Sequence, residues 1–173
     1  MVLVIISLFI IASYTAAVCI KQKGIPYSIS ATFYKLKHPY WFMAAMWSTA
    51  GLLMPAVLGI SKPGTEFLAF LACAGMIFVG AAPNFKEEME GKVHMSGAVI
   101  CVVASQLWVG CTPFWWILIP VWLAFIVYTV IGMGKHITGN IWQDFVSTKP
   151  MFWCEVGALL AVYTACGLVF RSI

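Results

Sequence analysis

Apolar residues occur along the chain in six long blocks, and polar residues gather in the stretches between them. Each block is about twenty residues long, which is the helix length needed to cross roughly 30 Å of hydrocarbon. The pattern predicts an all-α integral membrane protein: a bundle of six transmembrane helices in a single domain, residues 1–173. The predicted helices cover about residues 2–20, 41–60, 66–82, 94–111, 114–133 and 151–170.

The connections between the blocks differ in length and in charge. The first, third and fifth connections are longer, and the second and fourth are short turns. The longer connections contain eight of the ten basic residues: Lys21, Lys23, Lys35, Lys37, Lys86, Lys92, Lys135 and Lys149. The other two, Lys62 and Arg171, fall on the opposite side. Basic residues in short loops stay in the cytoplasm. We therefore expect both termini outside and the three longer connections in the cytoplasm.

The first connection has a helical pattern of its own. Ile25, Ile29 and Phe33 are spaced by four residues, which places them on one face of a helix. This spacing predicts a segment that lies in the headgroup layer, with any helix starting at Pro26. The same spacing recurs between residues 137 and 145 in the fifth connection. The recurrence has two readings, a repeated unit or a chance match of common apolar residues.

Composition and charge argue against a soluble protein and against a nucleic-acid-binding protein. Hydrophobic residues make up 62% of the chain and charged residues 9%, far from the average of a soluble domain. The six blocks and their connections leave no room for a soluble domain. The net charge of +4 is explained by the loop lysines, so we expect membrane lipids and no nucleic acid as partners. The six cysteines contain no CxxC pair and are interpreted as buried thiols rather than a disulfide framework.

Small residues line one face of two blocks and predict a homo-oligomer, because such faces let helices approach closely. They are Ala69, Cys73 and Gly80 in the third block, and Gly157, Ala161 and Ala165 in the sixth.

Candidate chemistry gathers at the predicted cytoplasmic boundary. Glu155 lies about one turn inside the last block, where a carboxylate is costly unless it is paired or wet. Its predicted partners are Lys149, Lys92 and His94. The candidate catalytic residues are Glu155, His94 and Asp144, and the candidate ligand-binding residues are Ser28, Ser30, Asn84, Asn140 and Gln143. The alternative is that these residues are polar simply because loops are polar.

The three histidines, His38, His94 and His136, are of a residue type that binds zinc. No pair of them has the i, i+3 or i, i+4 spacing that preorganises two ligands on a helix. None lies deep in a block, where a transmembrane haem would need its ligands. No metal and no cofactor is therefore predicted.

Two stretches of the sequence resemble segments of a known membrane-protein family. The run from Ile25 to Ser30, and the turn Gly80-Ala81-Ala82-Pro83-Asn84 before His94, are similar to segments of the DRAM/Frag-like six-helix membrane superfamily. Ala31 and Thr32 stand where that superfamily often has an acidic residue. The resemblance implies six helices, with no established biochemistry. Many members are bacterial, so the expected location is the bacterial inner (plasma) membrane.

Three functions are compatible with these observations. We favour a non-enzymatic membrane component that binds lipid or a partner protein through its cytoplasmic face. The second is a small transporter or channel, indicated by Glu155 and by prolines within the second and fifth blocks. The third is an integral-membrane enzyme acting on lipid headgroups. Whether the protein is an enzyme is left open, with the balance against it.

Overall fold

The structure is a computed structural model that describes residues 1–35, 38, 40–82, 87–135 and 138–172. All regular secondary structure in this part of the chain is helical, as the sequence predicts. The elements are α1 (Val2–Lys21), η1 (Ser30–Lys35), α2 (Tyr40–Ile60), α3 (Glu66–Ala81), α4 (Glu87–Cys111), η3 (Trp115–Ile117), α5 (Leu118–Lys135), α6 (Ile141–Ser147) and α7 (Pro150–Ser172). The fourth helix begins at Glu87, before the predicted start at residue 94.

Five helical stretches are long and apolar enough to cross a membrane, which makes the chain an integral membrane protein. They are Val2–Lys21, Tyr40–Ile60, Gly91–Cys111, Trp115–Lys135 and Pro150–Ser172. The sixth apolar helix, α3, has 16 residues and is shorter than the other five.

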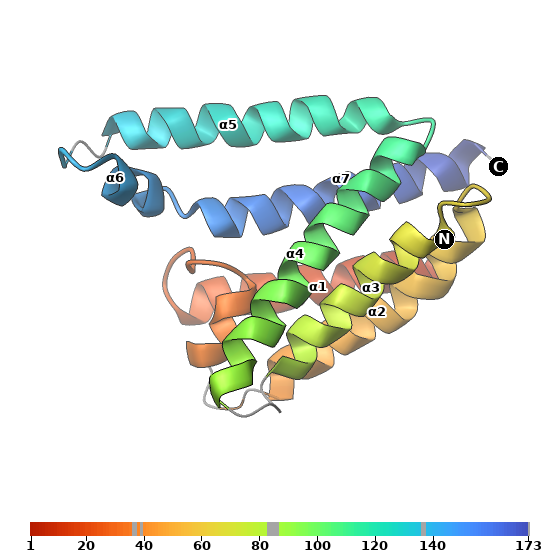
Figure 1. Cartoon of the computed structure of the whole chain (residues 1–173), viewed down its shortest axis with the longest axis horizontal. Helices are drawn as coiled ribbons and strands as arrows, with labels where there is room; N and C mark the ends of the chain where they lie inside the picture. Colours follow the sequence, from red (N-terminus) through yellow and green to blue (C-terminus); the bar gives the residue numbers. More distant parts are fainter. Residues whose placement is uncertain (36–37, 39, 83–86, 136–137, 173) are drawn as a thin grey trace.

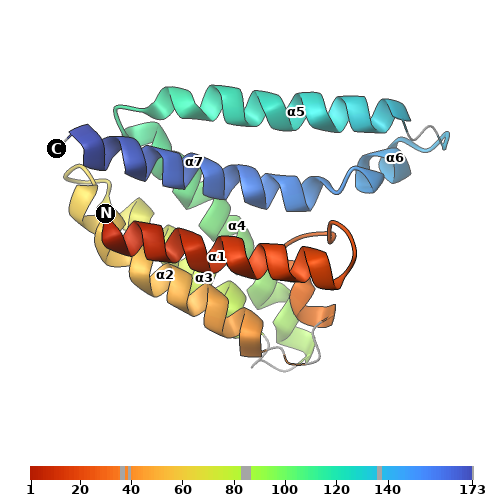
Figure 2. The ribbon, with the colours of Figure 1, turned by 180° about the vertical axis from the view of Figure 1, so that it is seen from behind.

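The helices form two groups that α4 and α7 join (Figures 1 and 2). Helices α1, α2 and α3 pack in chain order, α4 packs along α3, and α7 lies against α4. Helix α5 lies beyond α7, on the side away from α1 to α3. Both termini are at one end of the bundle, and η1 and α6 are at the other.

Helices α3 and α4 approach each other backbone to backbone. A Cβ atom added at Gly75 would lie 2.7 Å from the Gly97 carbonyl oxygen and 2.7 Å from the Cys101 nitrogen. Only glycine fits such a crossing, as at other close helix contacts in membranes.

The small-residue faces of α3 and α7 pack against other helices of the same chain. Ala69 and Cys73 of α3 are buried, and Ala161 and Ala165 of α7 are fully buried. The predicted homo-oligomer therefore gains no support from these residues, because other helices of the same chain already cover them.

The ends of α2 and α4 lie together. The indole Nε1–H of Trp108, near the end of α4, donates to Ser61 Oγ at 2.8 Å, and Ser61 directly follows α2. Helices α2 and α4 therefore run in the same direction, and α3 returns between them.

The segment expected in the first connection is shorter than predicted. The helix there is η1, a single 3-10 stretch that begins at Ser30 rather than at Pro26. The fifth connection contains the short α-helix α6. Each of these short elements lies just before a long helix, η1 before α2 and α6 before α7.

Candidate functional site

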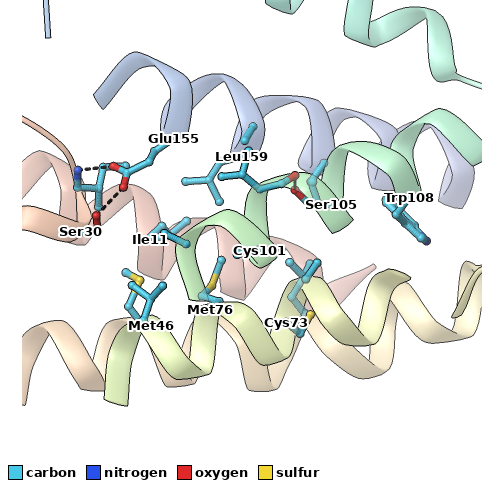
Figure 3. A pocket seen from close by; sticks show the side chains of 18 of the residues that line it. Ile11, Ser30, Met46, Cys73, Met76, Cys101, Ser105, Trp108, Glu155 and Leu159 are labelled. Carbon is cyan, nitrogen blue, oxygen red and sulfur yellow. Dashed lines mark hydrogen bonds between the residues drawn. The ribbon is translucent and has the colours of Figure 1, made fainter. Parts of the chain in front are cut away.

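The carboxylate of Glu155 joins the first connection to the last helix. Glu155 is partly buried in the second turn of α7. Its Oε1 accepts the Ser30 hydroxyl at 2.7 Å, and its Oε2 accepts the backbone N–H of Ile29 (Figure 3). Ile29 is only 5% exposed, so its N–H has little access to water. The carboxylate therefore satisfies a buried backbone donor of a segment more than a hundred residues away.

A backbone hydrogen bond extends this contact toward the start of α7. The first N–H groups of a helix have no partner within the helix. Pro150, the first residue of α7, lacks this group, as suits that position. The N–H of Phe152 donates to the Tyr27 carbonyl oxygen at 3.0 Å. We call the three contacts, from Phe152 to Tyr27 and from Glu155 to Ile29 and Ser30, the α7 clamp.

Further along α7, polar contacts with α4 and α1 hold it to the bundle. Gln106 of α4 donates from Nε2 to the Ala158 carbonyl oxygen at 3.3 Å. Its Oε1 accepts the indole N–H of Trp122, on α5, at 3.2 Å. Beyond these, the hydroxyls of Tyr163 and Ser7 share a hydrogen bond between α7 and α1. Gln106 thus forms the interhelical hydrogen bonds typical of a polar residue within a membrane helix.

An apolar cavity of about 100 Å³ begins at the Glu155 contact. Side chains of α1, α2, α3, α4, α7 and the segment at Ile29 and Ser30 line it. Glu155 and Ser30 lie at one end and Trp108 at the other, with Ser105 between them (Figure 3). The remaining lining is almost entirely hydrocarbon and sulfur.

Four sulfur-containing side chains face this cavity: Met46, Met76, Cys73 and Cys101. Methionine is unbranched and adapts its shape to what lies beside it, which suits the lining of a site for a flexible ligand. Among the described residues that line the cavity, Glu155 is the one with a charged side chain. The arrangement is a hydrocarbon-lined space with a single carboxylate at one end.

Two candidate ligand-binding residues prove to be capping residues. Ser28 Oγ accepts the Ala31 N–H at 2.9 Å, before η1. Asn140 Oδ1 accepts the N–H groups of Trp142 and Gln143 at 3.0 and 3.3 Å, at the start of α6. Serine and asparagine are favoured at helix starts for this reason. Of the four candidates that the structure describes, Ser30 is the one that lines the cavity.

Asp144 belongs to a separate, local arrangement. It is 8% exposed in α6, and its Oδ1 accepts the N–H and the hydroxyl of Thr138 at 2.9 and 2.7 Å. These bonds close the loop before α6. The structure therefore does not bring Asp144 to the partners of Glu155.

The two described histidines occupy different parts of the fold. His38 is exposed before α2, and His94 is partly buried in α4. Within the described ranges, no group of three His, Cys, Asp or Glu residues could hold a metal ion. His136 and Asn84 lie outside the described residues.

The predicted partners of Glu155 differ from the observed ones. Lys149, Lys92 and His94 were the predicted partners. The donors observed are the Ile29 N–H and the Ser30 hydroxyl, and in the described part of the chain no lysine or arginine forms an ion pair with this carboxylate. The first connection supplies its donors instead. Ile29 and Tyr27 take part through backbone groups, which no side-chain pattern identifies.

The chain was compared with protein-family models, with curated proteins and with solved structures, and it matches none of them. The resemblance to the DRAM/Frag-like superfamily therefore stays a prediction. The geometry of the cavity and of the α7 clamp is the basis on which a function can be proposed.

Proposed function

We propose that the protein is a non-enzymatic membrane component that binds an amphipathic lipid inside its helix bundle. The observation that carries this proposal is the hydrocarbon-lined cavity with Glu155 at one end. Apolar cavities in proteins stay dry and bind hydrocarbons. An apolar chain between α7 and α3 would restore the dispersion contacts that the lining side chains otherwise lack.

The polar end of this lipid would lie at Glu155 and Ser30. Both groups are at the end of the bundle that also holds η1 and α6, so a headgroup there is close to the membrane surface. The chain would extend along the cavity past Met76 toward Trp108.

Retention of the lipid tests this proposal. In Ala158→Phe, an aromatic ring replaces a buried methyl group that lines the cavity. Ala124→Phe is the matched control, because Ala124 is exposed on α5 and does not line the cavity. Native mass spectrometry from mild detergent should show a lipid bound to the wild type and to Ala124→Phe, and none bound to Ala158→Phe. Equal retention in all three would overturn the proposal.

The proposal includes six membrane spans in the bacterial inner (plasma) membrane, with both termini outside. The return of α3 between α2 and α4 supports a sixth crossing, although α3 is short. The lysine distribution supports the orientation, because Lys21 and Lys135 end helices at the side opposite the termini.

Thiol labelling tests this orientation. In a variant that keeps only Cys111, which is exposed at the end of α4, a membrane-impermeant maleimide should label intact cells. A variant with only Gly24→Cys should be labelled after the cells are opened, because residue 24 is predicted to be cytoplasmic. The reverse pattern would contradict the orientation.

A second candidate function, transport, rests on the same carboxylate. Ionisable residues within membrane segments commonly mark ion or substrate pathways. Flux of a solute or of protons in reconstituted vesicles, lost in Glu155→Gln, would favour this candidate. The third function, an enzyme acting on headgroups, has less support, because Asp144 is bound to Thr138 and is not joined to Glu155.

A further inference from the structure

We propose that the amphiphile in the cavity carries a protonated amine on a single apolar chain, and that its ammonium group binds the Glu155 carboxylate. This inference rests on the proposed lipid-binding function and names the chemical class of the ligand. Three properties of the site lead to it: the free acceptor positions of the carboxylate, the absence of a lysine or arginine paired with it among the described residues, and the absence of a cation in the described lining.

The carboxylate has acceptor capacity left after the clamp has formed. An ionised carboxylate has about four lone-pair positions on its two oxygens. The Ser30 hydroxyl uses one on Oε1, the Ile29 N–H uses one on Oε2, and the Ser30 backbone N–H also interacts with the carboxylate. An ammonium group at the end of the cavity can donate to those that remain, so the ligand need not displace the clamp.

In the described part of the site, the carboxylate also has no positively charged partner. Its present donors are neutral groups, and in the described part of the chain no lysine or arginine is paired with Glu155. A carboxylate in a membrane segment is costly unless it is paired or wet. A cationic ligand supplies the missing partner, and charge-assisted hydrogen bonds are about twice as strong as neutral ones.

The lining argues against a phosphate on the same ligand. None of the described cavity-lining residues is a lysine, an arginine or a histidine. A phosphate beside the ammonium would therefore lie near Glu155 without a cation from the described lining to neutralise it. The site fits a single-chain amine better than the headgroup of an aminophospholipid.

A series of ligands with one chain length tests the inference. The probes are dodecylamine, dodecanol, dodecanoate and a lysophosphatidylethanolamine with a twelve-carbon chain, each titrated into the wild-type protein in the same mild detergent and followed by native mass spectrometry. Dodecylamine should bind about tenfold or more tightly than dodecanol, since a charge-assisted bond replaces a neutral one. Dodecanoate and the lysophospholipid should bind more weakly than dodecylamine.

Two variants separate the role of charge from the role of shape. Glu155→Gln keeps the size of the side chain and removes its charge, so it should bind dodecylamine no better than dodecanol. Asp144→Asn removes the charge of a carboxylate that does not line the cavity, so it should keep the preference for the amine. The wild-type series is decisive even if Glu155→Gln does not fold.

The outcomes distinguish this inference from the function on which it rests. If dodecanol binds the wild type as tightly as dodecylamine, or the lysophospholipid binds more tightly, the amine assignment is wrong, and the cavity still binds lipid. If no probe binds differently in the wild type and in Ala158→Phe, both the inference and the proposed function are wrong.

Discussion

Two short helical segments, η1 before α2 and α6 before α7, begin alike and bind different partners. Each follows a polar cap: Ser28 accepts an N–H three residues later, and so does Asn140. The segment at η1 then reaches across to Glu155 on another helix. In α6 the carboxylate of Asp144 turns back to Thr138, in its own loop.

The difference shows what makes one of these segments part of a site. At α6 the cap and the carboxylate both form hydrogen bonds within their own loop, so the segment is not joined to another helix by them. At η1 the acceptor comes from α7 and also faces an apolar cavity, so the same contact closes the fold and presents a carboxylate to the interior.

Removing the carboxylate of Glu155 should destabilise the protein more than any change at α6. Glu155→Ala leaves the buried N–H of Ile29 and the Ser30 hydroxyl without their acceptor. We expect the free energy of unfolding to fall by about 3 kcal/mol, because a hydrogen bond to a charged group contributes roughly 1.5–3 kcal/mol. Hydrogen exchange should show lost protection at the Ile29 amide and unchanged protection in α6. Unchanged protection at Ile29 would contradict the clamp.

The corresponding change in α6 should have a smaller and local effect. Asp144→Ala removes both bonds to Thr138, and we expect a loss of about 2 kcal/mol, since one of the two freed donors is a backbone group. Amides from Thr138 to Ser147 should exchange faster. Ile29 should keep its protection, and a loss there would show that the two segments are coupled.

Ser30→Ala should separate the contribution of the side-chain bond to Glu155 from that of the backbone bond. It removes one hydroxyl from the clamp and leaves the bond from Ile29 to Glu155 in place. We expect a loss of about 1 kcal/mol, typical of a single hydrogen bond, measured by denaturant unfolding in detergent. A loss as large as that in Glu155→Ala would mean that the backbone contact contributes little.

The two caps should give the smallest effects, and similar ones. Ser28→Ala and Asn140→Ala each remove a side-chain acceptor at a helix start, with an expected loss of about 1 kcal/mol or less at these short elements. Amide exchange within η1 and α6 measures each loss separately. Faster exchange at Ile29 in Asn140→Ala would contradict the independence of the two segments.

Much of the fold could be predicted from the sequence, because a membrane helix is a local feature. A block of apolar residues must form a helix to satisfy its own backbone in lipid. The start of α4 at Glu87 was missed because charged residues do not belong to an apolar block, although a helix can begin before the membrane does.

The site could be predicted only in part. A carboxylate among apolar residues drew attention to Glu155, and the polar first connection drew attention to Ser30. Their contact depends on the return of α7 to the first connection and on backbone groups of Tyr27 and Ile29, which leave no pattern in the sequence. The cavity depends on the shapes of side chains from five helices, and composition does not encode it.

The central claim is that this cavity holds the apolar chain of a lipid. Crosslinking with a dodecylamine that carries a diazirine in its chain, followed by peptide mapping, tests it most directly. The account predicts that label concentrates on cavity residues such as Met76 and Leu159, and that Ala158→Phe loses this label. Label spread evenly over exposed positions of α5, such as Ile126 and Val130, in both proteins would contradict it.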